Sequence, residues 1–154
     1  MNKVINIAVV GLGQVGIYLL NELNIKKKEI ELKTGKKINV VAISARSINK
    51  KRRFKINKKI FYKNPLNLFK YKKIDILFEV VGFADGISKK IVETALKKKI
   101  HVITPNKALI SKHGDYLSKL AEENNVNLEF EASVAGGIPI LRTIKESLAT
   151  NKIL

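Results

Sequence analysis

The chain contains 154 residues, of which 45% are hydrophobic and 28% are charged. This composition fits one globular domain with a real hydrophobic core and excludes an intrinsically disordered chain. The chain has no cysteine, which excludes a disulfide scaffold, a thiolate zinc site, an iron–sulfur cluster and a cysteine nucleophile. No apolar run approaches the ~18–20 residues of a membrane span and no signal peptide is recognisable, so we expect a cytoplasmic protein.

The charge of the chain is strongly positive, with 30 lysines and arginines against 13 aspartates and glutamates and a net charge of +17. Such a charge can indicate a nucleic-acid partner. However, 26 of the basic residues are lysine and only four are arginine, whereas recognition of base edges and phosphates favours arginine. The lysines are also spread along the whole chain, so we expect no nucleic-acid partner. The competing hypothesis predicts binding to DNA or RNA that weakens steeply with salt.

Strand and helix patterns alternate along the chain. Apolar, β-branched runs such as VINIAVV predict buried parallel strands, and apolar residues at helical spacing predict helices that cover them. The predicted strands cover 4–10, 38–44, 75–81, 100–103 and 126–131. The predicted helices cover 16–27, 86–99, 106–124 with Asn106 as the N-cap and an interruption near Gly114, and 138–149. We interpret 26–37 as a solvated helix end and loop, and 49–63 as irregular.

Five strands that alternate with helices indicate an α/β fold, a Rossmann-type doubly wound parallel sheet with helices on both faces. In such sheets ligands bind outside the carboxyl ends of the strands, so the loops that follow the strands are the candidate binding regions. We expect residues 1–154 to form one domain of a larger protein.

A glycine motif of the form GxGxxG follows the first predicted strand and opens the first predicted helix. In this context Gly11 permits the tight turn, Gly13 lets a pyrophosphate approach the backbone, and Gly16 lets the helix pack close to the strand. The free N–H groups of the helix N-terminus then favour phosphates. The alternative is a glycine-rich turn without a ligand. The predicted cofactor-binding segment is Gly11, Leu12, Gly13, Gln14, Val15 and Gly16.

The end of the second strand selects between the two nicotinamide cofactors. An acidic residue there binds the ribose 2′-hydroxyl of NAD, whereas a nearby arginine accommodates the 2′-phosphate of NADP. This chain has no carboxylate at that place, since Glu31 lies in the charged stretch before the strand, and Arg46 follows the strand directly. We therefore favour NADP over NAD. The alternative is that Arg46 is a surface arginine in a basic loop, which continues with Lys50, Lys51, Arg52 and Arg53.

Three further segments follow predicted strands: EVVG at 79–82, VITPNK at 102–107 and EASVAGGIP at 131–139. With GLGQVG they resemble homoserine dehydrogenase, and the resemblance covers essentially the whole chain. It implies an NAD(P)-binding domain of an oxidoreductase that reversibly reduces aspartate 4-semialdehyde to homoserine, on the route to threonine and methionine. It also implies a small-molecule substrate and a homodimer in the complete enzyme.

The resemblance assigns roles to two residues near the fourth strand. Lys107 matches the lysine that lies beside the nicotinamide and the reacting substrate, where an ammonium favours a developing alkoxide. Thr104, together with the segment Ala132–Ser133, is expected to line the nicotinamide pocket. The alternative for Lys107 is one more solvent-exposed lysine at the start of a helix.

The resemblance also implies a monovalent-cation site, such as one for sodium. A carboxylate and backbone carbonyls in a tight glycine turn would supply oxygen ligands there. The alternative for Glu131 is a carboxylate that interacts with the dipole of the helix that follows. The matching residues are Glu131, Val134, Gly136 and Ile138.

The resemblance further implies that 138–154 begin the connection to a separate substrate-binding domain. That domain, with the family's main proton-transfer residues, has no counterpart in these 154 residues, so we expect this stretch alone to bind cofactor without turnover. Two alternative functions stay open: a stand-alone NAD(P)-binding regulatory module and a related oxidoreductase that acts on aspartate or its semialdehyde. We assign no catalytic or metal-binding role to His101 or His113.

Overall fold

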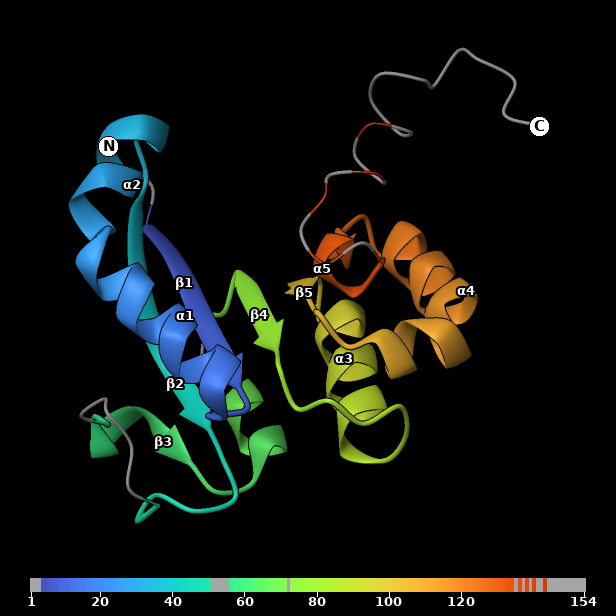
Figure 1. The fold of residues 1–154 in the computed structure, drawn as a ribbon, viewed down its shortest axis with the longest axis horizontal. Helices are drawn as coiled ribbons and strands as arrows, with labels where there is room; N and C mark the ends of the chain where they lie inside the picture. The colour runs from blue at the N-terminus through green and yellow to red at the C-terminus, as the bar shows by residue number, and fades with distance from the viewer. Residues whose placement is uncertain are drawn as a thin grey trace.

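The computed structural model describes residues 4–50, 56–71 and 73–134, together with positions 136, 138, 140 and 143. It contains a six-stranded sheet in the order β3-β2-β1-β4-β5-β6, in which all strand pairs are parallel (Figure 1). This is the order of a doubly wound sheet, so the predicted fold class is confirmed. The strands are β1 (Val4–Val10), β2 (Lys37–Ser44), β3 (Phe61–Tyr62), β4 (Ile76–Glu79), β5 (His101–Ile103) and β6 (Leu128–Glu129). The helices are α1 (Gln14–Ile25), α2 (Lys27–Thr34), α3 (Ile87–Lys97), α4 (Lys107–Glu123) and α5 (Glu131–Val134), with 3₁₀ turns η1 (Lys58–Ile60) and η2 (Pro65–Lys70).

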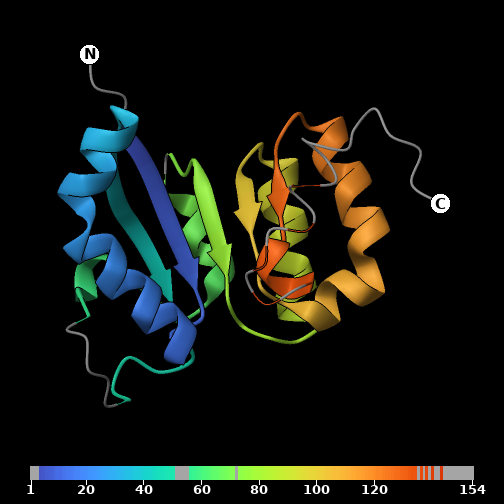
Figure 2. The same ribbon diagram turned by 45° about the horizontal axis from the view of Figure 1, so that its top comes forward.

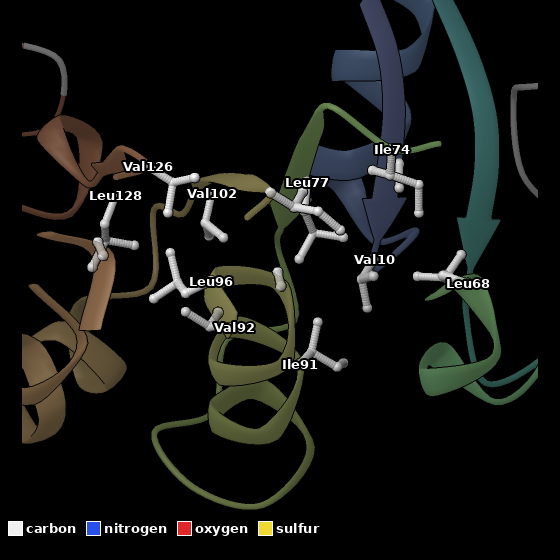
Figure 3. Close-up of a cluster of buried hydrophobic side chains, with 14 of the residues drawn as sticks. Val10, Leu68, Ile74, Leu77, Ile91, Val92, Leu96, Val102, Val126 and Leu128 are labelled. Carbon is white, nitrogen blue, oxygen red and sulfur yellow. The ribbon is translucent and has the colours of Figure 1, made fainter. Parts of the chain in front are cut away.

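The hydrophobic core lies on both faces of the sheet because side chains alternate along each strand. In β1, Ile7 and Val9 join the cluster that includes Leu20 of α1. Val10 joins the opposite cluster, which includes Ile91 of α3 (Figure 3). Helices therefore cover both faces of the sheet, as the near-continuous apolar strands predict. Within the described residues, no helix is long and apolar enough to cross a membrane.

The three central strands end at one edge of the sheet. Val10 of β1 lies opposite Ser44 of β2 on one side and opposite Glu79 of β4 on the other. In Figure 2 the arrowheads of these blue, teal and green strands point to the same edge. The strand order reverses between β1 and β4, and such a reversal is where doubly wound sheets bind ligands.

Two segments that the sequence analysis treats as loop or irregular contain regular structure. The lysine-rich segment forms α2, which has no buried residue and ends at Gly35 with φ of +65°. The exposure of this segment to solvent is as expected, but its helix is longer than the helix end that the sequence predicts. Within 49–63, β3 pairs Phe61 with Ile43 and Tyr62 with Ser44 at the end of β2. A two-residue strand is too short to show a periodic pattern, which explains the omission.

The second half of the chain differs from expectation in two places. The predicted interruption of α4 at Gly114 is wrong, because the helix continues through it to Glu123. Buried residues on both sides of the glycine, among them Leu109 and Leu117, hold the helix against the core. The predicted strand 126–131 is reduced to β6, and Glu131 begins α5 instead. Most of the predicted helix 138–149 lies outside the described residues.

Gly114→Ala tests the continuity of α4. A methyl group at this position would contact only the Ile110 side chain, at 3.4 Å. We expect the free energy of unfolding to rise by about 0.5–1 kcal/mol, because alanine replaces glycine inside a regular helix. Urea unfolding measures the change. The control is Gly35→Ala, the same chemical change at a left-handed position, which should lower that free energy by about 1–2 kcal/mol. Destabilisation by Gly114→Ala would show that the helix breaks there.

Candidate functional site

The turn between β1 and α1 packs closely against the residues that follow β4, and the backbone of Val80 lies against Gly11. Gly11 has φ of +102°, and a Cβ atom there would overlap the carbonyl oxygen of Val80. A Cβ atom at Gly16 would overlap the carbonyl oxygen of Gly11. Side chains are therefore excluded at both positions. The Gly11 N–H also donates to the carbonyl of Ser44 at 2.9 Å, which ties the turn to β2.

Gly13 occupies the opposite environment. A Cβ atom built there has no heavy atom within 4 Å, and its φ of −76° suits any residue. Neither backbone conformation nor protein packing therefore requires glycine at this position. An open approach to the backbone is what a bound pyrophosphate needs.

At the N-terminus of α1, no side chain of the cap residue accepts a hydrogen bond from the first backbone N–H groups. Gly13 is the N-cap residue, it has no side chain to accept a hydrogen bond, and no acidic residue lies in the first turn. The first N–H groups of a helix lack intrahelical partners, and the helix dipole adds a partial positive charge. This helix start therefore suits an anion.

A cleft of about 620 Å³ opens beside the glycine turn at the carboxyl edge of the sheet. This volume lies within the range of about 300–1,000 Å³ that is typical of small-molecule and cofactor sites. Among the described residues, three cationic side chains, Arg46, Lys50 and Lys63, line the cleft, and no aspartate or glutamate does. The cleft therefore suits an anionic ligand. Its lining residues are Val10, Gly11, Leu12, Gly13, Ser44, Ala45, Arg46, Ser47, Lys50, Lys63, Pro65, Val80, Val81, Phe83 and Ile87.

Sequence reasoning identified Arg46 but missed Lys63. Lys63 follows β3, and a strand of two residues gives no signal that would bring its loop beside β2. Glu31, in contrast, lies in α2 and forms an ion pair with Lys37 at 3.7 Å. It therefore belongs to the charged stretch before β2, as expected, and not to the end of the strand. Lys51, Arg52 and Arg53 lie outside the described residues.

A buried polar cluster lies at the same edge of the sheet, where β4 and β5 end. Glu79, Thr104 and Asn106 are 0%, 1% and 4% exposed. Thr104 Oγ1 donates to Glu79 Oε2 at 2.6 Å, and Asn106 Nδ2 donates to the same oxygen at 3.3 Å. Asn106 Oδ1 also accepts from the Leu109 N–H at 3.1 Å, which confirms the predicted N-cap of α4.

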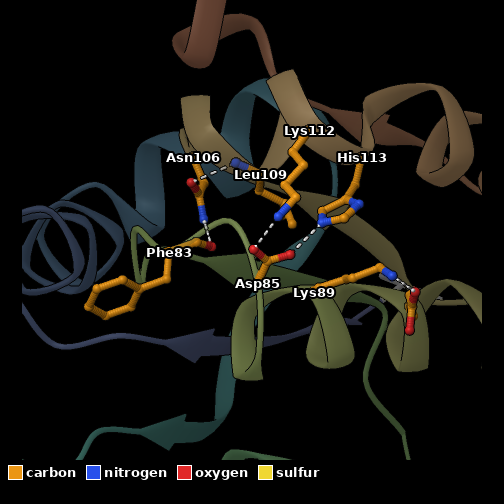
Figure 4. A network of polar contacts seen from close by, with 8 residues as sticks. Phe83, Asp85, Lys89, Asn106, Leu109, Lys112 and His113 are labelled. Carbon is orange, nitrogen blue, oxygen red and sulfur yellow. Dashed lines mark hydrogen bonds and ion pairs between the residues drawn. The ribbon is translucent and has the colours of Figure 1, made fainter.

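The loop between β4 and α3 is fastened to α4 by polar contacts (Figure 4). Asn106 Nδ2 donates to the carbonyl oxygen of Phe83 at 2.8 Å. Lys112 Nζ donates to Asp85 at 2.6 Å, and the His113 ring lies 2.8 Å from the other carboxylate oxygen. The hydrogen bond from Lys112, followed by that of His113, lowers the pKa of the Asp85 carboxyl below its ordinary value. His113 thus contacts a carboxylate that its sequence context did not indicate.

Comparison with known proteins identifies the family. The family model described as "Homoserine dehydrogenase, NAD binding domain" matches residues 11–131. The chain belongs to this family. The homoserine dehydrogenase of Neisseria gonorrhoeae is 37% identical over 151 residues, which are 98% of this chain and 34% of that protein. That of Bacillus subtilis is 32% identical over 98% of this chain and 35% of that protein.

Solved structures agree with this assignment. A homoserine dehydrogenase from Thiobacillus denitrificans matches with a TM-score of 0.86 and 33% identity, over 98% of this chain and 35% of that one. A hyperthermophilic archaeal homoserine dehydrogenase mutant in complex with NADPH matches with a TM-score of 0.73 and 25% identity, over 95% of this chain and 50% of that one. The chain spans about a third of the length of the curated relatives.

The predicted cofactor residues of this homoserine dehydrogenase domain fall into two groups. Gly11, Leu12, Gly13 and Arg46 line the cleft. Gly16 is buried behind the turn, while Gln14 and Val15 are exposed on α1. Thr104 and Lys107 lie past the end of β5 and are not among the residues that line the cleft. The Thr104 hydroxyl faces Glu79, and Lys107 is an exposed residue at the first position of α4.

The residues predicted for a cation site lie around α5. Glu131 is half-buried at the first position of this helix, and Val134 is exposed at the last. Gly136 has φ of +62°, which fits the tight glycine turn that the prediction requires. Gly136 and Ile138 are exposed. In the part of the chain that the structure describes, no three His, Cys, Asp or Glu side chains come together as a metal site.

A pair of alanine variants separates the two roles of glycine in the turn. Gly13→Ala should leave the free energy of unfolding nearly unchanged, since the added methyl group meets no protein atom. It should weaken NADPH binding about tenfold or more, because hydrogen bonds to a charged group contribute about 1.5–3 kcal/mol each. Gly16→Ala should lower the free energy of unfolding by about 1–3 kcal/mol, because its methyl group overlaps the Gly11 carbonyl oxygen.

Urea unfolding and NADPH fluorescence titration of both variants provide the two measurements. Wild-type NADPH affinity in folded Gly13→Ala would show that the phosphates do not approach the backbone at this glycine.

Proposed function

We propose that this chain supplies the cofactor-binding part of a homoserine dehydrogenase, which reversibly reduces aspartate 4-semialdehyde to homoserine with NAD(P)H. That reaction lies on the route to threonine and methionine. The observation that carries the proposal is a cation-lined cleft at the strand-order reversal, beside an unobstructed Gly13, in a chain of the homoserine dehydrogenase family. The test is homoserine-dependent reduction of NADP by the full-length protein that the gene encodes.

The described residues fit a nicotinamide dinucleotide. The start of α1 offers N–H groups for the pyrophosphate, and Gly13 leaves space for its approach. The cleft is large enough for the adenosine half, and its apolar lining includes Val80 and Ile87. When bound, the nicotinamide ring accepts or supplies the hydride of the reaction. The protein's own task is to hold the cofactor and the substrate in one fixed geometry.

NADP is the preferred cofactor in this proposal. Arg46, Lys50 and Lys63 line the cleft. Arg46 follows β2 and Lys63 follows β3, which pairs with the end of β2, where the ribose phosphate of NADP would lie. Among the lining residues that the structure describes, none is a carboxylate that would bind the 2′-hydroxyl of NAD. A guanidinium suits a phosphate because it donates two parallel hydrogen bonds.

Arg46→Gln tests the cofactor preference. We expect NADPH binding to weaken about 10- to 100-fold, since a hydrogen bond to a charged group contributes about 1.5–3 kcal/mol. NADH binding should change little, because NADH lacks the 2′-phosphate. Fluorescence titration of both cofactors measures the two dissociation constants. The control is Lys97→Gln, which removes one positive charge from the exposed end of α3. Equal losses for both cofactors would contradict a contact with the 2′-phosphate.

Lys107 is the substrate-side residue of this proposal. It is the first residue of α4, directly after the carboxyl end of β5, and its side chain is exposed. An ammonium group held there would pair with the substrate oxygen and stabilise the alkoxide that develops as the carbonyl is reduced.

Residues such as Glu131 and Gly136 would bind a monovalent cation. The full-length enzyme would form a homodimer in the cytoplasm.

Lys107→Ala in the full-length protein tests this role. We expect turnover of homoserine to fall by about 10²-fold or more, the usual effect of removing a group that stabilises developing negative charge. The matched control is Lys119→Ala, an exposed lysine farther along the same helix, which should retain turnover. Steady-state assays with saturating NADP provide the measurement. Near-normal turnover in Lys107→Ala would overturn the assignment.

A further inference from the structure

Glu79 is a fully buried acidic side chain at the carboxyl end of β4. Among the described residues, no lysine, arginine or histidine forms an ion pair with it. Burial of an acidic group away from any positive charge is costly, and a well-packed apolar residue is often at least as stable in such a place. Stability alone is therefore a poor explanation for glutamate at this position.

Both carboxylate oxygens of Glu79 act as acceptors. Oε1 accepts from the N–H of Val81 at 2.9 Å, two residues farther along the chain and directly after β4. Oε2 accepts from the hydroxyl of Thr104 at 2.6 Å and from the side-chain amide of Asn106 at 3.3 Å. One side chain on β4 thus binds the loop that follows its own strand and the loop that follows β5.

These contacts continue directly to the start of α4. Thr104 Oγ1 accepts from the backbone N–H of Asn106 at 3.1 Å, and Asn106 Oδ1 caps the helix at Leu109. The side-chain amide of Asn106 also donates to the Phe83 carbonyl (Figure 4). Lys107 is the residue next to Asn106 and the first of the helix. Its backbone is therefore held in place, while its side chain remains exposed.

We propose that Glu79 is a positioning residue that acts through Thr104 and Asn106 to set the place of Lys107 at the substrate. The inference rests on the proposed function, because it assumes that Lys107 meets the substrate. The hydrogen bonds fix the backbone of Lys107 relative to β4, next to the cofactor cleft. Turnover is sensitive to this distance, since a displacement of about 1 Å at a reacting group can cost about 10²-fold.

Glu79→Gln is the sharpest substitution because it keeps the size and shape of the side chain. The carboxylate offers two acceptor oxygens to three donors, whereas an amide has only one oxygen. Whichever way the amide is turned, its NH₂ group faces either the Val81 N–H or the Asn106 amide. At least one donor is left without an acceptor, so the loops shift relative to β4.

The experiment compares Glu79→Gln with Leu77→Ala in the full-length protein. Leu77 is also fully buried on β4, two residues earlier, but it belongs to the apolar core. We expect Glu79→Gln to lower kcat for homoserine about tenfold or more, with the KM for NADP changed less than about threefold. Leu77→Ala should lower the melting temperature at least as much and leave kcat within about twofold. Both are assayed well below their melting temperatures.

A second variant and a second readout complete the test. Asn106→Ser keeps a hydroxyl that can cap the helix, but this shorter side chain cannot reach Glu79. We therefore expect kcat to fall in this variant too. If Glu79→Gln does not fold, Asn106→Ser decides the test. Nuclear magnetic resonance shifts of the Lys107 and Leu109 amides should move in Glu79→Gln and not in Leu77→Ala. Wild-type kcat in both polar variants, or unchanged amide shifts, would overturn the inference. An inactive wild-type protein would overturn the proposed function instead. The amide shifts would then still show whether Glu79 holds the backbone of Lys107 in place.

Discussion

The site depends on the close packing of the β1–α1 turn against the end of β4. Side chains are excluded at Gly11 and Gly16 because each would overlap a carbonyl oxygen of the turn or of the neighbouring strand. This contact fixes the start of α1 at the point where the strand order reverses. The open backbone at Gly13 lines the cleft, and Gly13 is also the N-cap of a helix whose first N–H groups have no intrahelical partner. The anion site therefore follows from the close packing of this turn.

The carboxyl edge of the sheet divides into two parts with opposite electrostatics. On the β2 side, Arg46 and Lys63 line a cleft to which the described part of the chain contributes no acidic side chain. On the β5 side, the buried Glu79 accepts hydrogen bonds from a hydroxyl, a side-chain amide and a backbone N–H. The first part suits a ligand with phosphates, whereas the second holds loops in a fixed arrangement. The β4–α3 loop, with Phe83, touches both parts, since it lines the cleft and is bonded to Asn106.

Most of the large positive charge has no direct part in this site. Many lysines lie on exposed helix faces, and several form ion pairs one helical turn away from a glutamate: Glu22 with Lys26, Glu29 with Lys33 and Lys89 with Glu93. Exposed pairs of this kind add little to stability and are screened by salt. The cations of the cleft act differently, because they converge with a helix N-terminus on one cavity. The location of the charge is therefore more informative than its total.

Sequence reasoning predicted the parts of this protein that depend on local pattern. Apolar runs located five of the six strands, a single side chain placed the cap at Asn106, and the glycine motif with the TPNK and EASVAGGIP segments identified the family. These features need only neighbours along the chain, whose spacing the sequence displays directly.

Only the tertiary structure decided the contacts that join distant segments. Lys63 enters the cleft because β3 pairs with β2 over two residues, too few to leave a periodic signal. Glu79 meets Asn106 across 27 positions, and Asp85 meets His113 across 28. Gly114 remains helical because core packing on either side outweighs its weak helix propensity. In each case the deciding free energy comes from residues that are remote in the chain, which a local pattern does not contain.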